Sequence, residues 1–439
     1  MQNRILSAVF LFLTPFLYLQ AQVVYSLSDC IALGLENNYS LLVARNNETI
    51  AKNNFTLGNA GFLPSLSLSS RYGGTLNNTT QNFTDGSQSL SSGIHNTTAN
   101  AAVTMGLTIF NGFNVQTTYK KLNELRQIGE LNTQMSIENL LTAIIAGYYN
   151  YILQIQLLNN MQYAVALSRE RLRIDEARYL LGSGSKLQVL QSQVYLNADS
   201  SRMSRQYEVV RAAQINLNEL MAVEDLSMRF ESKDSLINVN PDLIYEKLFE
   251  ETMARNTSLN IASKNVIISE YDYKIIASRS YPSLNLSSGY STSLNTFSSS
   301  ATRNQFTNGM NYGLSLGMNL FNGNNQRRSM MNSSIEVSNR ELRYQEIEQG
   351  IKADLITFFS AYTNYLRLIA LQEQNLETAT ENLEIALERY RLGSLSGIDL
   401  REVQKSLLDA YESLSSIQFQ TKMAELSLMQ ISGRIMDYY

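Results

Sequence analysis

The chain has 439 residues, a net charge of −4, one Cys and one His. Its length allows two or three ordinary domains, and its charge gives no sign of a nucleic-acid partner. A single Cys excludes an internal disulfide and a thiolate metal cluster, and a single His makes zinc sites and His-based catalysis hard to build. We therefore predict that the chain is not an enzyme and holds neither a metal nor a cofactor.

Residues 1–21 have the pattern of a secretory signal peptide. Arg4 supplies the positive charge, residues 5–19 form the apolar run, and Ala21 offers a small residue for cleavage. A retained membrane anchor is the alternative, but the run is short for a span of about 20 residues. Because no later segment has the apolar length of about 18 residues that marks a membrane helix, the mature chain can meet a membrane only through strands.

Residues 22–62 are predicted to form a helical segment, in which Cys30 lies in an amphipathic setting and acts as a small buried hydrophobe. The pattern then changes to a period of two residues, first over 65–75 and again over 99–109. Apolar residues alternate there with Ser, Thr, Asn or Gly, which predicts two strands of about ten residues within 63–112.

The length and one-sided polarity of these strands are typical of strands that span a membrane in a barrel. A soluble, half-buried hairpin has the same alternation and remains an alternative. The stretch between the strands, 76–98, is rich in Asn, Thr, Ser and Gln, as expected of an extracellular loop. The only charges in or near the predicted strands are Arg71, which falls on the polar face, and Arg303.

A helical apolar repeat runs over 115–181, and at about 1.5 Å per residue it predicts a helix about 100 Å long. Gly182 suits the left-handed position that ends a helix, and Ser185 begins a capping box for the next one. The chain is therefore predicted to return through a second helix over 187–222, which makes a coiled-coil hairpin within 113–222.

The second half of the chain repeats the first. Pro64-Ser65-Leu66 returns as Pro282-Ser283-Leu284, and Phe110-Asn111-Gly112 returns as Phe321-Asn322-Gly323. An ordered duplication of this kind predicts two copies of one structural unit. The remaining predicted parts are a linker at 223–241, a helical segment at 242–280, two strands within 281–323 that flank a polar loop at 295–308, a hairpin within 324–432 with a long helix over 325–392 and a return helix over 397–432, and a tail at 433–439.

Four strands cannot close a barrel by themselves, and open strand edges cannot lie in lipid. Two copies would give eight strands, whose interior is filled by side chains, whereas three copies would give twelve strands with room for a lumen. The same three copies would bring together six helical hairpins, whose apolar lines allow them to pack into a tube. The sequence therefore predicts a homotrimer in which a barrel continues into a helical tunnel.

The two Pro-Ser-Leu entries, the two Phe-Asn-Gly strand ends and the tips Arg178-Tyr179-Leu180-Leu181-Gly182-Ser183 and Arg389-Tyr390-Arg391-Leu392-Gly393-Ser394 resemble those of the TolC family of outer-membrane efflux proteins. The resemblance covers nearly the whole mature chain. It implies a mainly α fold with a membrane β-barrel part: a trimer in the cell outer membrane with a twelve-stranded barrel and an α-helical tunnel across the periplasm.

The resemblance also implies a function, that of the exit duct of a tripartite efflux pump for drugs or other small molecules. Its partners would be a periplasmic adaptor protein and, through the adaptor, an inner-membrane RND, ABC or MFS transporter. A duct for type I protein secretion is an alternative within the family. A non-conducting coiled-coil surface or scaffold protein is an alternative outside it. Lipid contact would require one nearly charge-free face on all four strands, which distinguishes the duct from the scaffold.

In the family, acidic side chains after the second tip form a ring that narrows the periplasmic end of the tunnel. The matching positions are Asp399 and Glu402, one helical turn apart. Asp399 also fits the role of capping partner of Ser396, and Glu402 that of a solvated helix charge. Family members often carry a basic latch residue in this turn, where this chain has Leu395, so Arg391 or Arg401 are the candidates to replace it.

The tip groove contacted by the adaptor in relatives corresponds to Tyr179 with Gly182 and to Tyr390 with Gly393. The resemblance implies that these four residues form the adaptor-docking tips. Helix termination and packing between hairpins would require a Gly and a bulky residue at the same places, so both roles stay open for them.

Overall fold

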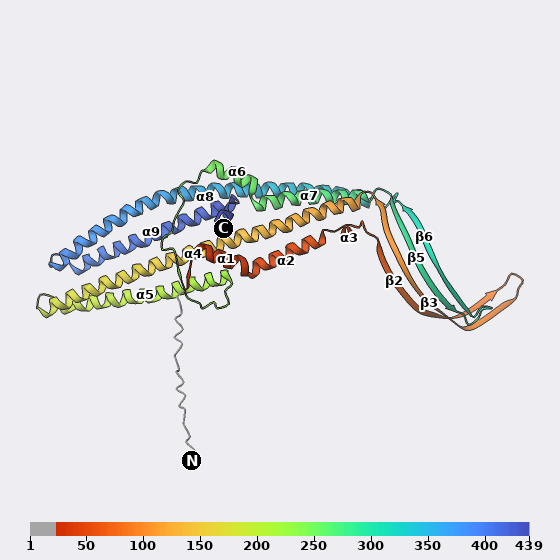
Figure 1. Ribbon diagram of the computed structural model, residues 1–439, viewed down its shortest axis with the longest axis horizontal. Helices are drawn as coiled ribbons and strands as arrows, with labels where there is room; N and C mark the ends of the chain where they lie inside the picture. The colour runs from red at the N-terminus through yellow and green to blue at the C-terminus, as the bar shows by residue number, and fades with distance from the viewer. Residues whose placement is uncertain (1–22, 439) are drawn as a thin grey trace, which may run out of the picture.

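The computed structural model describes residues 23–438, so the signal peptide predicted over 1–21 lies outside the described part of the chain. The helices form an elongated bundle, and a four-stranded sheet extends from one end of it (Figure 1). The elements are, in chain order, β1 Val23–Tyr25, α1 Leu27–Asn37, α2 Tyr39–Asn54, α3 Leu57–Ala60, β2 Ser65–Asn82, β3 Gln88–Asn111, α4 Asn114–Leu180, α5 Lys186–Met221, β4 Phe230–Ser232, α6 Tyr245–Arg255, α7 Thr257–Ser278, β5 Ser283–Thr296, β6 Asn304–Gly317, α8 Asn325–Arg391, α9 Gly397–Ile431 and the 3-10 helix η1 Ile435–Tyr438.

Each half contains one long helical hairpin, α4 with α5 and α8 with α9, and the two hairpins turn in the same way. Both long helices have 67 residues. They end at Gly182 and Gly393, whose φ angles of 74° and 82° belong to the left-handed region where glycine is favoured. Ser185 and Ser396 then cap the return helices through their side-chain oxygens.

The equivalence of the two halves extends to their shorter helices, α1 with α6 and α2 with α7. Asn38 caps α2 and Asn256 caps α7, each through its side-chain oxygen. The amide nitrogen of Asn38 donates to the Leu220 carbonyl over 3.1 Å, and that of Asn256 donates to the Ile431 carbonyl over 2.9 Å. Since Leu220 and Ile431 end the two return helices, these matching bonds show that each half is the same structural unit.

Helix α4 lies in the middle of the helical bundle, whereas α5 and α8 lie at the two edges of the bundle. Along the hairpins α4 packs against α5 and α9, and α9 packs against α8, so the helices follow the order α5, α4, α9, α8. The largest apolar core surrounds the middle of α4, where Ile144, Tyr148 and the predicted buried thiol of Cys30 are fully enclosed. Helix α8 is buried at few positions, namely Ser333, Ile351, Leu355, Tyr362, Leu383, Ala386 and Tyr390.

The sheet is antiparallel with the strand order β2-β3-β5-β6. Its strands are longer than predicted. Of the stretches predicted as extracellular loops, 76–98 is mostly strand, and 295–308 contains the end of β5 and the start of β6. Thr75 pairs with Asn96 and Leu76 with His95, so the ladder continues into the polar region and turns only at 83–87. Gly86, with a φ of 84°, allows that tight turn. Polar composition misled the prediction because Thr, Ser and Asn side chains do not prevent the backbone from pairing.

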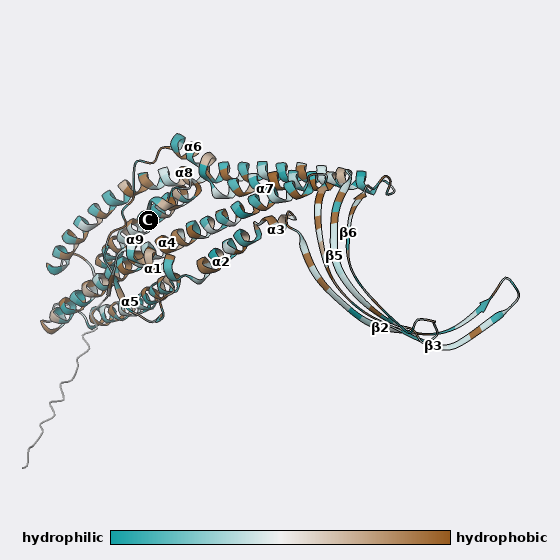
Figure 2. Cartoon of the chain, turned by 45° about the vertical axis from the view of Figure 1, so that its right-hand side comes forward, coloured by the Kyte–Doolittle hydropathy of each residue, from teal (hydrophilic) through white to brown (hydrophobic). Residues whose placement is uncertain are grey.

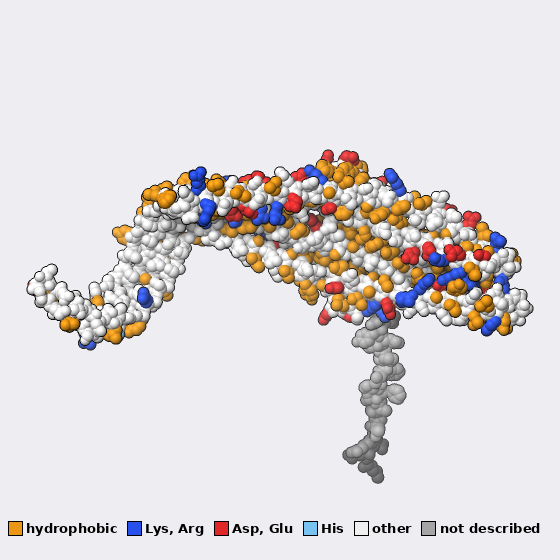
Figure 3. Space-filling view, turned by 180° about the vertical axis from the view of Figure 1, so that it is seen from behind, with side chains coloured by type: hydrophobic (Ala, Val, Ile, Leu, Met, Phe, Trp, Pro, Cys, Tyr) orange, Lys and Arg blue, Asp and Glu red, His pale blue; other side chains and the backbone are white. Residues whose placement is uncertain are grey.

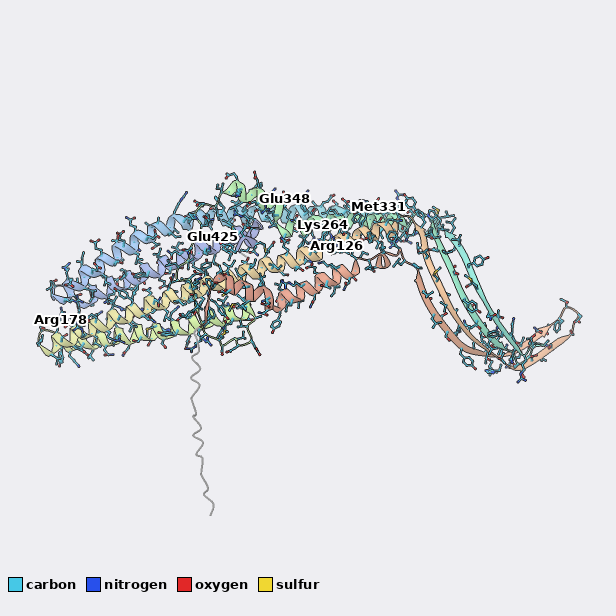
Figure 4. All side chains as sticks on the ribbon, viewed as in Figure 1. Arg126, Arg178, Lys264, Met331, Glu348 and Glu425 are labelled. Atoms are coloured by element: carbon cyan, nitrogen blue, oxygen red, sulfur yellow. The ribbon has the colours of Figure 1, made fainter. Side chains whose placement is uncertain are left out.

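The linker and the C-terminal tail pack against the middle of the bundle. Residues 230–232 form β4, which pairs in parallel with β1, a contact that the sequence did not reveal. In the tail, the Tyr438 hydroxyl donates to the Glu425 carboxylate over 2.7 Å, and Lys422 lies 2.9 Å from the same oxygen. These groups fix the tail against α9; Figure 4 labels Glu425. Among the described residues, no helix combines the length and hydropathy needed to cross a membrane.

Candidate functional site

The register of the four strands gathers their apolar residues on one face of the sheet. One row across all four strands is Leu68, Val103, Tyr290 and Met310. The alternation of side chains along each strand then assigns every second residue to the same face, and Figure 2 shows hydrophobic and hydrophilic residues alternating along the strands. The face comprises Leu66, Leu68, Ser70, Tyr72, Ala99, Ala101, Val103, Met105, Leu107, Leu284, Leu286, Ser288, Tyr290, Thr292, Leu294, Phe306, Asn308, Met310, Tyr312, Leu314 and Leu316.

No Lys, Arg, Asp or Glu lies on this apolar face. The opposite face carries Ser, Thr, Asn, Gln and Gly, and its one charge is Arg71, which pairs with Asn100 on the polar side as predicted. The apolar side chains are open to the surroundings: Leu68 is 75% exposed and Tyr312 is 84% exposed. Charged side chains gather over the helices instead, as the visible face in Figure 3 shows.

The two outer strands of the sheet, β2 and β6, each have one edge that pairs with no strand in residues 23–438. The alternation of apolar and polar residues continues in the sequence to Leu320, but β6 ends at Gly317. The ladder stops there because Gly317 is opposite Ser283, where β5 begins. Leu320 and Phe321 beyond it are 87% and 78% exposed.

At the far end of the molecule, a polar cluster joins the two hairpins. The Arg401 guanidinium of α9 donates two hydrogen bonds, of 2.7 and 2.8 Å, to the carboxylate of Asp199 on α5. Asp199 is 2% exposed. Its burial raises its pKa, but hydrogen bonds from Arg401 and Ser168 outweigh burial and hold that pKa below its ordinary value of 3.8.

A second buried carboxylate, Asp175 of α4, lies nearer the tip. It accepts hydrogen bonds from the Tyr390 hydroxyl of α8 and from the Ser192 hydroxyl of α5. Burial, followed by the bond to Asp175, raises the pKa of Tyr390 to about 12. The Arg178 guanidinium lies 4.7 Å from the centre of the Tyr390 ring and donates to the Tyr390 carbonyl. Figure 4 shows Arg178 at the end of the first hairpin.

Two further contacts complete the junction between the hairpins. The ring of Tyr195 on α5 is within 4.8 Å of Arg171 and within 5.1 Å of Arg401, measured to each guanidinium carbon. The Asn160 amide of α4 donates to the Leu408 carbonyl of α9 over 3.1 Å. We call this junction between the two hairpins the within-copy seam. Its bonds fix both the distance and the register of the hairpins, because bidentate Arg–carboxylate pairs are strongly directional.

Of the two residues suggested as a replacement latch, Arg401 joins the hairpins through a buried carboxylate. Arg391 reaches Glu388 of its own helix at 2.8 Å and Glu170 of α4 at 3.7 Å. Both of its partners are partly open to water, so these pairs contribute little. The partners Asp175 and Asp199 were not predicted, because nothing in the sequence signals which carboxylate lies opposite a residue about 200 positions away.

The predicted gate residues lie at the start of α9. Asp399 accepts a hydrogen bond of 2.7 Å from the Ser396 hydroxyl, and its backbone N–H donates to that oxygen over 3.2 Å, so it takes part in the helix cap. Both Asp399 and Glu402 are exposed in the single chain. Within residues 23–438, no group of three or more His, Cys, Asp or Glu is arranged to hold a metal ion.

The predicted docking residues differ between the two tips. Gly182 and Gly393 form the turns described above. Tyr179 is 44% exposed, whereas Tyr390 is 2% exposed and packs into the within-copy seam. The two tyrosines occupy equivalent positions, so the difference arises because only the second hairpin has a neighbour on that side in the same chain.

Comparisons with solved structures show the fold. The chain is similar to the CmeC outer membrane channel of Campylobacter jejuni, with a TM-score of 0.75, 14% identity, and coverage of 93% of this chain and 85% of that one. It is similar to the outer membrane protein VceC of Vibrio cholerae, with a TM-score of 0.74, 15% identity, and coverage of 93% and 96%. It is also similar to the open state of the MtrE channel of Neisseria gonorrhoeae, with a TM-score of 0.71, 14% identity, and coverage of 93% of this chain and 88% of that one.

No curated protein matches the chain in sequence. The family model of the outer membrane efflux protein matches residues 31–223 and 248–434. This match and the structural likenesses confirm the resemblance to the TolC family and the prediction that the chain is not an enzyme, because proteins of this family are transport ducts. Since the match covers most of its residues, the chain belongs to the outer membrane efflux protein family.

Proposed function

We propose that three copies of this chain form the exit duct of a tripartite efflux pump in the cell outer membrane, which exports drugs or other small molecules. The observation that carries the proposal is the apolar face, which is free of charge across all four strands. On β5 it runs from Leu284 to Leu294, which is the length of about 9–11 residues that a tilted strand needs to cross a bilayer. The opposite, polar face of the sheet suits a water-filled lumen.

The free edges of the sheet support assembly from several copies. At the junction within the chain, Gly112 of β3 approaches the Ser278 carbonyl and Tyr281 so closely that a Cβ would clash. Its equivalent after β6, Gly323, has open space around it apart from Asn325. The second junction is therefore vacant, and the entry to β2 of another copy would fill it. Three copies give twelve strands, which is enough for a lumen, while two copies do not.

The same arrangement would join the hairpins into a tube. Six hairpins with long helices of 67 residues give a tunnel about 100 Å long across the periplasm. Asp399 and Glu402 of three copies would place six carboxylates around its periplasmic end. A ring of this kind attracts cations and repels anions, so we assign these residues to the gate.

We further propose that a periplasmic adaptor docks at the tips and connects the duct to an inner-membrane RND, ABC or MFS transporter. Tyr179 and Gly182 offer an exposed ring beside an open turn, because a Cβ on Gly182 would meet no other atom within 4 Å. Gly393 offers an equivalent turn. Tyr390 contributes to docking through the shape of the tip, since its ring is buried against α4.

The proposal is tested by placing an Arg on each face of β6. Leu314 lies on the apolar face and Ser315 beside it lies on the polar face, so Leu314→Arg and Ser315→Arg form a matched pair. An Arg facing the middle of the bilayer costs about 2–4 kcal/mol per copy. We expect Leu314→Arg to prevent insertion into the outer membrane, measured by membrane fractionation and by conductance in planar bilayers.

The Ser315→Arg variant should insert normally and shift the conductance toward anions, because its charge would line the lumen. Equal insertion of both variants, or purification of the wild-type chain as a water-soluble protein without conductance, would contradict the proposal and favour a scaffold.

A further inference from the structure

The two halves of the chain can be compared residue by residue at the boundary between the sheet and the helices. Helix α8 begins at Asn325 and α4 at Asn114, an offset of 211 residues, and the helix caps Asn256 and Asn38 differ by 218 residues. The first offset applies to the start of each long helix and the second to the segment before each sheet entry. The side chains that these offsets pair differ in size and in charge.

In the first half, aromatic rings fill the space between the shorter helices and the start of α4. The Tyr119 ring lies 4.7 Å from the Phe55 ring and 5.9 Å from the Phe62 ring, measured between centroids. A Cβ on Gly61 would lie 3.4 Å from a methyl carbon of Val115, so the backbone is also in contact there. The boundary of the first half is therefore a closed, mainly apolar contact.

In the second half, the equivalent space is open. Ser280 stands where the first half has Phe62, and Met330 stands where it has Tyr119, so two of the three rings are missing. A cavity of about 840 Å³ lies there, which we call the boundary hollow. Its lining includes Tyr273, Ser280, Met318, Phe321, Met330 and Met331. Figure 4 shows Met331 at the end of α8 that joins the sheet.

Two arginines also line the boundary hollow, and their side chains have no partner. Arg279 caps α7, and Arg327 lies in the first turn of α8. Their equivalents in the first half, Gly61 and Gln116, carry no charge. Within residues 23–438, neither guanidinium group makes a hydrogen bond, an ion pair or a ring contact.

The carboxylates nearest to these arginines in the sequence pair with other cations. No Asp or Glu occurs between Asp272 and Glu336. Asp272 lies 2.5 Å from the Lys121 amine, and Glu336 lies 3.0 Å from the Arg340 guanidinium. Figure 3 shows Lys and Arg side chains where the sheet joins the helices. Two guanidinium groups that share one hollow without a carboxylate repel each other, so the hollow is complementary to an anion.

The boundary hollow opens at the edge of the apolar face that lies nearest the helices. Met318 and Phe321 line it, and their equivalents in the first half are Leu107 and Phe110. Leu107 and Phe110 both pair across the sheet with residues of the apolar face. In the proposed duct, this edge lies where the hydrocarbon of the bilayer gives way to the lipid headgroups on the periplasmic side.

A neighbouring copy would leave the boundary hollow open. The close contact of Gly112 with Ser278 and Tyr281 joins one half to the other, and its vacant counterpart at Gly323 is the place for the next copy. The hollow lies instead between α7 and α8 of the same half, since Tyr273 of α7 lines it together with the start of α8. It therefore stays accessible from the bilayer in the proposed trimer.

We propose that the boundary hollow binds an anionic glycerophospholipid of the leaflet that faces the periplasm. The guanidinium groups of Arg279 and Arg327 hold the lipid phosphate, because guanidinium and phosphate form charge-assisted and often bidentate hydrogen bonds. The flexible side chains of Met330 and Met331, with the Phe321 ring, contact the first part of its acyl chains. The inference rests on the proposed function, because only a chain inserted in the outer membrane meets this leaflet. One trimer carries three such lipids.

Native mass spectrometry of the detergent-purified protein tests the proposal, because it reports the number of chains and the number of bound lipids together. The protein is titrated with phosphatidylglycerol, with phosphatidylcholine of the same acyl chains, and with glycerol phosphate as a headgroup without chains. We expect phosphatidylglycerol to bind with an affinity about tenfold or more above that of phosphatidylcholine, because the arginines favour a net negative headgroup. Glycerol phosphate should bind far more weakly than either lipid.

A matched pair of double variants tests the two arginines. Arg279→Gln with Arg327→Gln should abolish the preference for phosphatidylglycerol, and it should fold because neither guanidinium has a partner. Arg71→Gln with Arg303→Gln removes the same charge from exposed positions elsewhere on the sheet and should keep the preference. Equal behaviour of the two variants, or equal affinity of the wild type for both lipids, would overturn the inference. Glycerol phosphate that binds as tightly as the lipid would also overturn it, because the hollow would then be a site for free phosphate.

Filling the boundary hollow provides a second test that removes no charge. Ser280→Phe with Met330→Tyr copies the contact between Phe62 and Tyr119 of the first half, so it should occupy the space and lower the affinity for phosphatidylglycerol to that for phosphatidylcholine. Unchanged lipid binding in an assembled trimer would contradict the assignment to this hollow.

The particle mass separates the inference from the proposed function. Single chains would contradict the duct, whichever lipids they bind. A trimer without a preference between the two lipids would keep the duct and overturn the inference alone.

Discussion

At the scale of single residues, two buried carboxylates hold the helical end of the molecule together. Asp175 and Asp199 are each 2% exposed and each accepts hydrogen bonds from both hairpins. A buried carboxylate is stable only while its partners remain. The two aspartates therefore connect local side-chain chemistry to the position of a whole hairpin.

The isosteric change Asp199→Asn tests this connection. It leaves the Arg401 guanidinium, whose side chain is 16% exposed, without its charged partner, and loss of one partner of a buried pair costs about 3–5 kcal/mol. We expect the free energy of local opening of α9 near Arg401 to fall by that amount, measured by amide hydrogen exchange. Asp409→Asn, at an exposed position of the same helix, is the control and should change exchange little. Equal effects of the two variants would show that the pair does not hold the seam.

The pH dependence of the seam follows from the same residue. Because the folded pKa of Asp199 lies below its ordinary value of 3.8, its contribution to stability is complete above that pH and is lost as the pH falls through the folded pKa. Arg401 and Arg202 face it and stay protonated throughout. We expect the distance between spin labels on Leu187 and Ile398, exposed near the two tips, to stay constant from about pH 8 to pH 5.

Below the ordinary pKa the distance distribution should broaden. In the Asp199→Asn variant the distance distribution should already be broad at neutral pH and should change little as the pH falls. A transition near neutral pH in the unmodified protein would contradict the assignment.

The gate assignment leads to a separate prediction for ion flow. Replacing both Asp399 and Glu402 by Ala removes six carboxylates from the proposed ring, so cation preference should fall and leakiness should rise. Single-channel conductance and reversal potentials measure both effects. Asp399→Ala alone also removes the carboxylate that accepts a hydrogen bond from the Ser396 hydroxyl. Ser396→Ala, which removes the N-cap itself at a cost of about 0.5–2 kcal/mol, serves as the control for cap loss. Unchanged selectivity in the double variant would dismiss the gate.

At the scale of elements, the sequence predicted what depends on local pattern. The first long helix was predicted over 115–181 and is found at Asn114–Leu180, because the apolar repeat and Gly182 are both local signals. The existence and alternation of the four strands were predicted for the same reason. The true lengths of the strands were not predicted, because a polar stretch can pair through its backbone without any alternation of apolar residues in the sequence.

Contacts between distant segments could not be predicted in the same way. The β1–β4 pair joins residues about 200 positions apart in strands of only three residues. The partners of Arg401 and Tyr390 lie in the other half of the chain. The sequence gives each residue type, but the packing of two long helices determines which residues pair. A shift of one helix along the other by one turn would replace every pair.

The equivalence of the halves also predicts the strand register between copies. Within the chain Gly106 is opposite Ser287, and the equivalent residues are Gly317 of one copy and Ser69 of the next. In a Cys30→Ser background, Gly317→Cys with Ser69→Cys should therefore form a disulfide between chains, seen as dimer and trimer bands on non-reducing gels. Ser67→Cys or Arg71→Cys with Gly317→Cys, displaced by two residues on the same face, should react far less.

The pair Gly106→Cys with Ser287→Cys provides a positive control, because it should form within one chain and give no larger band. A displaced pair that cross-links better than the predicted one would show that the two junctions are not equivalent.

At the scale of the whole molecule, the proposed duct requires several copies of the chain to close into a ring. Its apolar sheet face, its unpaired strand edges and its two edge helices are all surfaces that a single copy leaves open. The duplication supplies the geometry, since each half repeats the relation that joins it to the next.

Electron microscopy of the purified protein in lipid nanodiscs would show whether the chain assembles into a trimeric duct. We expect particles with threefold symmetry, in which twelve strands close around a lumen within the bilayer and a helical tube about 100 Å long extends from one side. Single chains in water, each with its sheet folded against its own helices, would contradict this assembly.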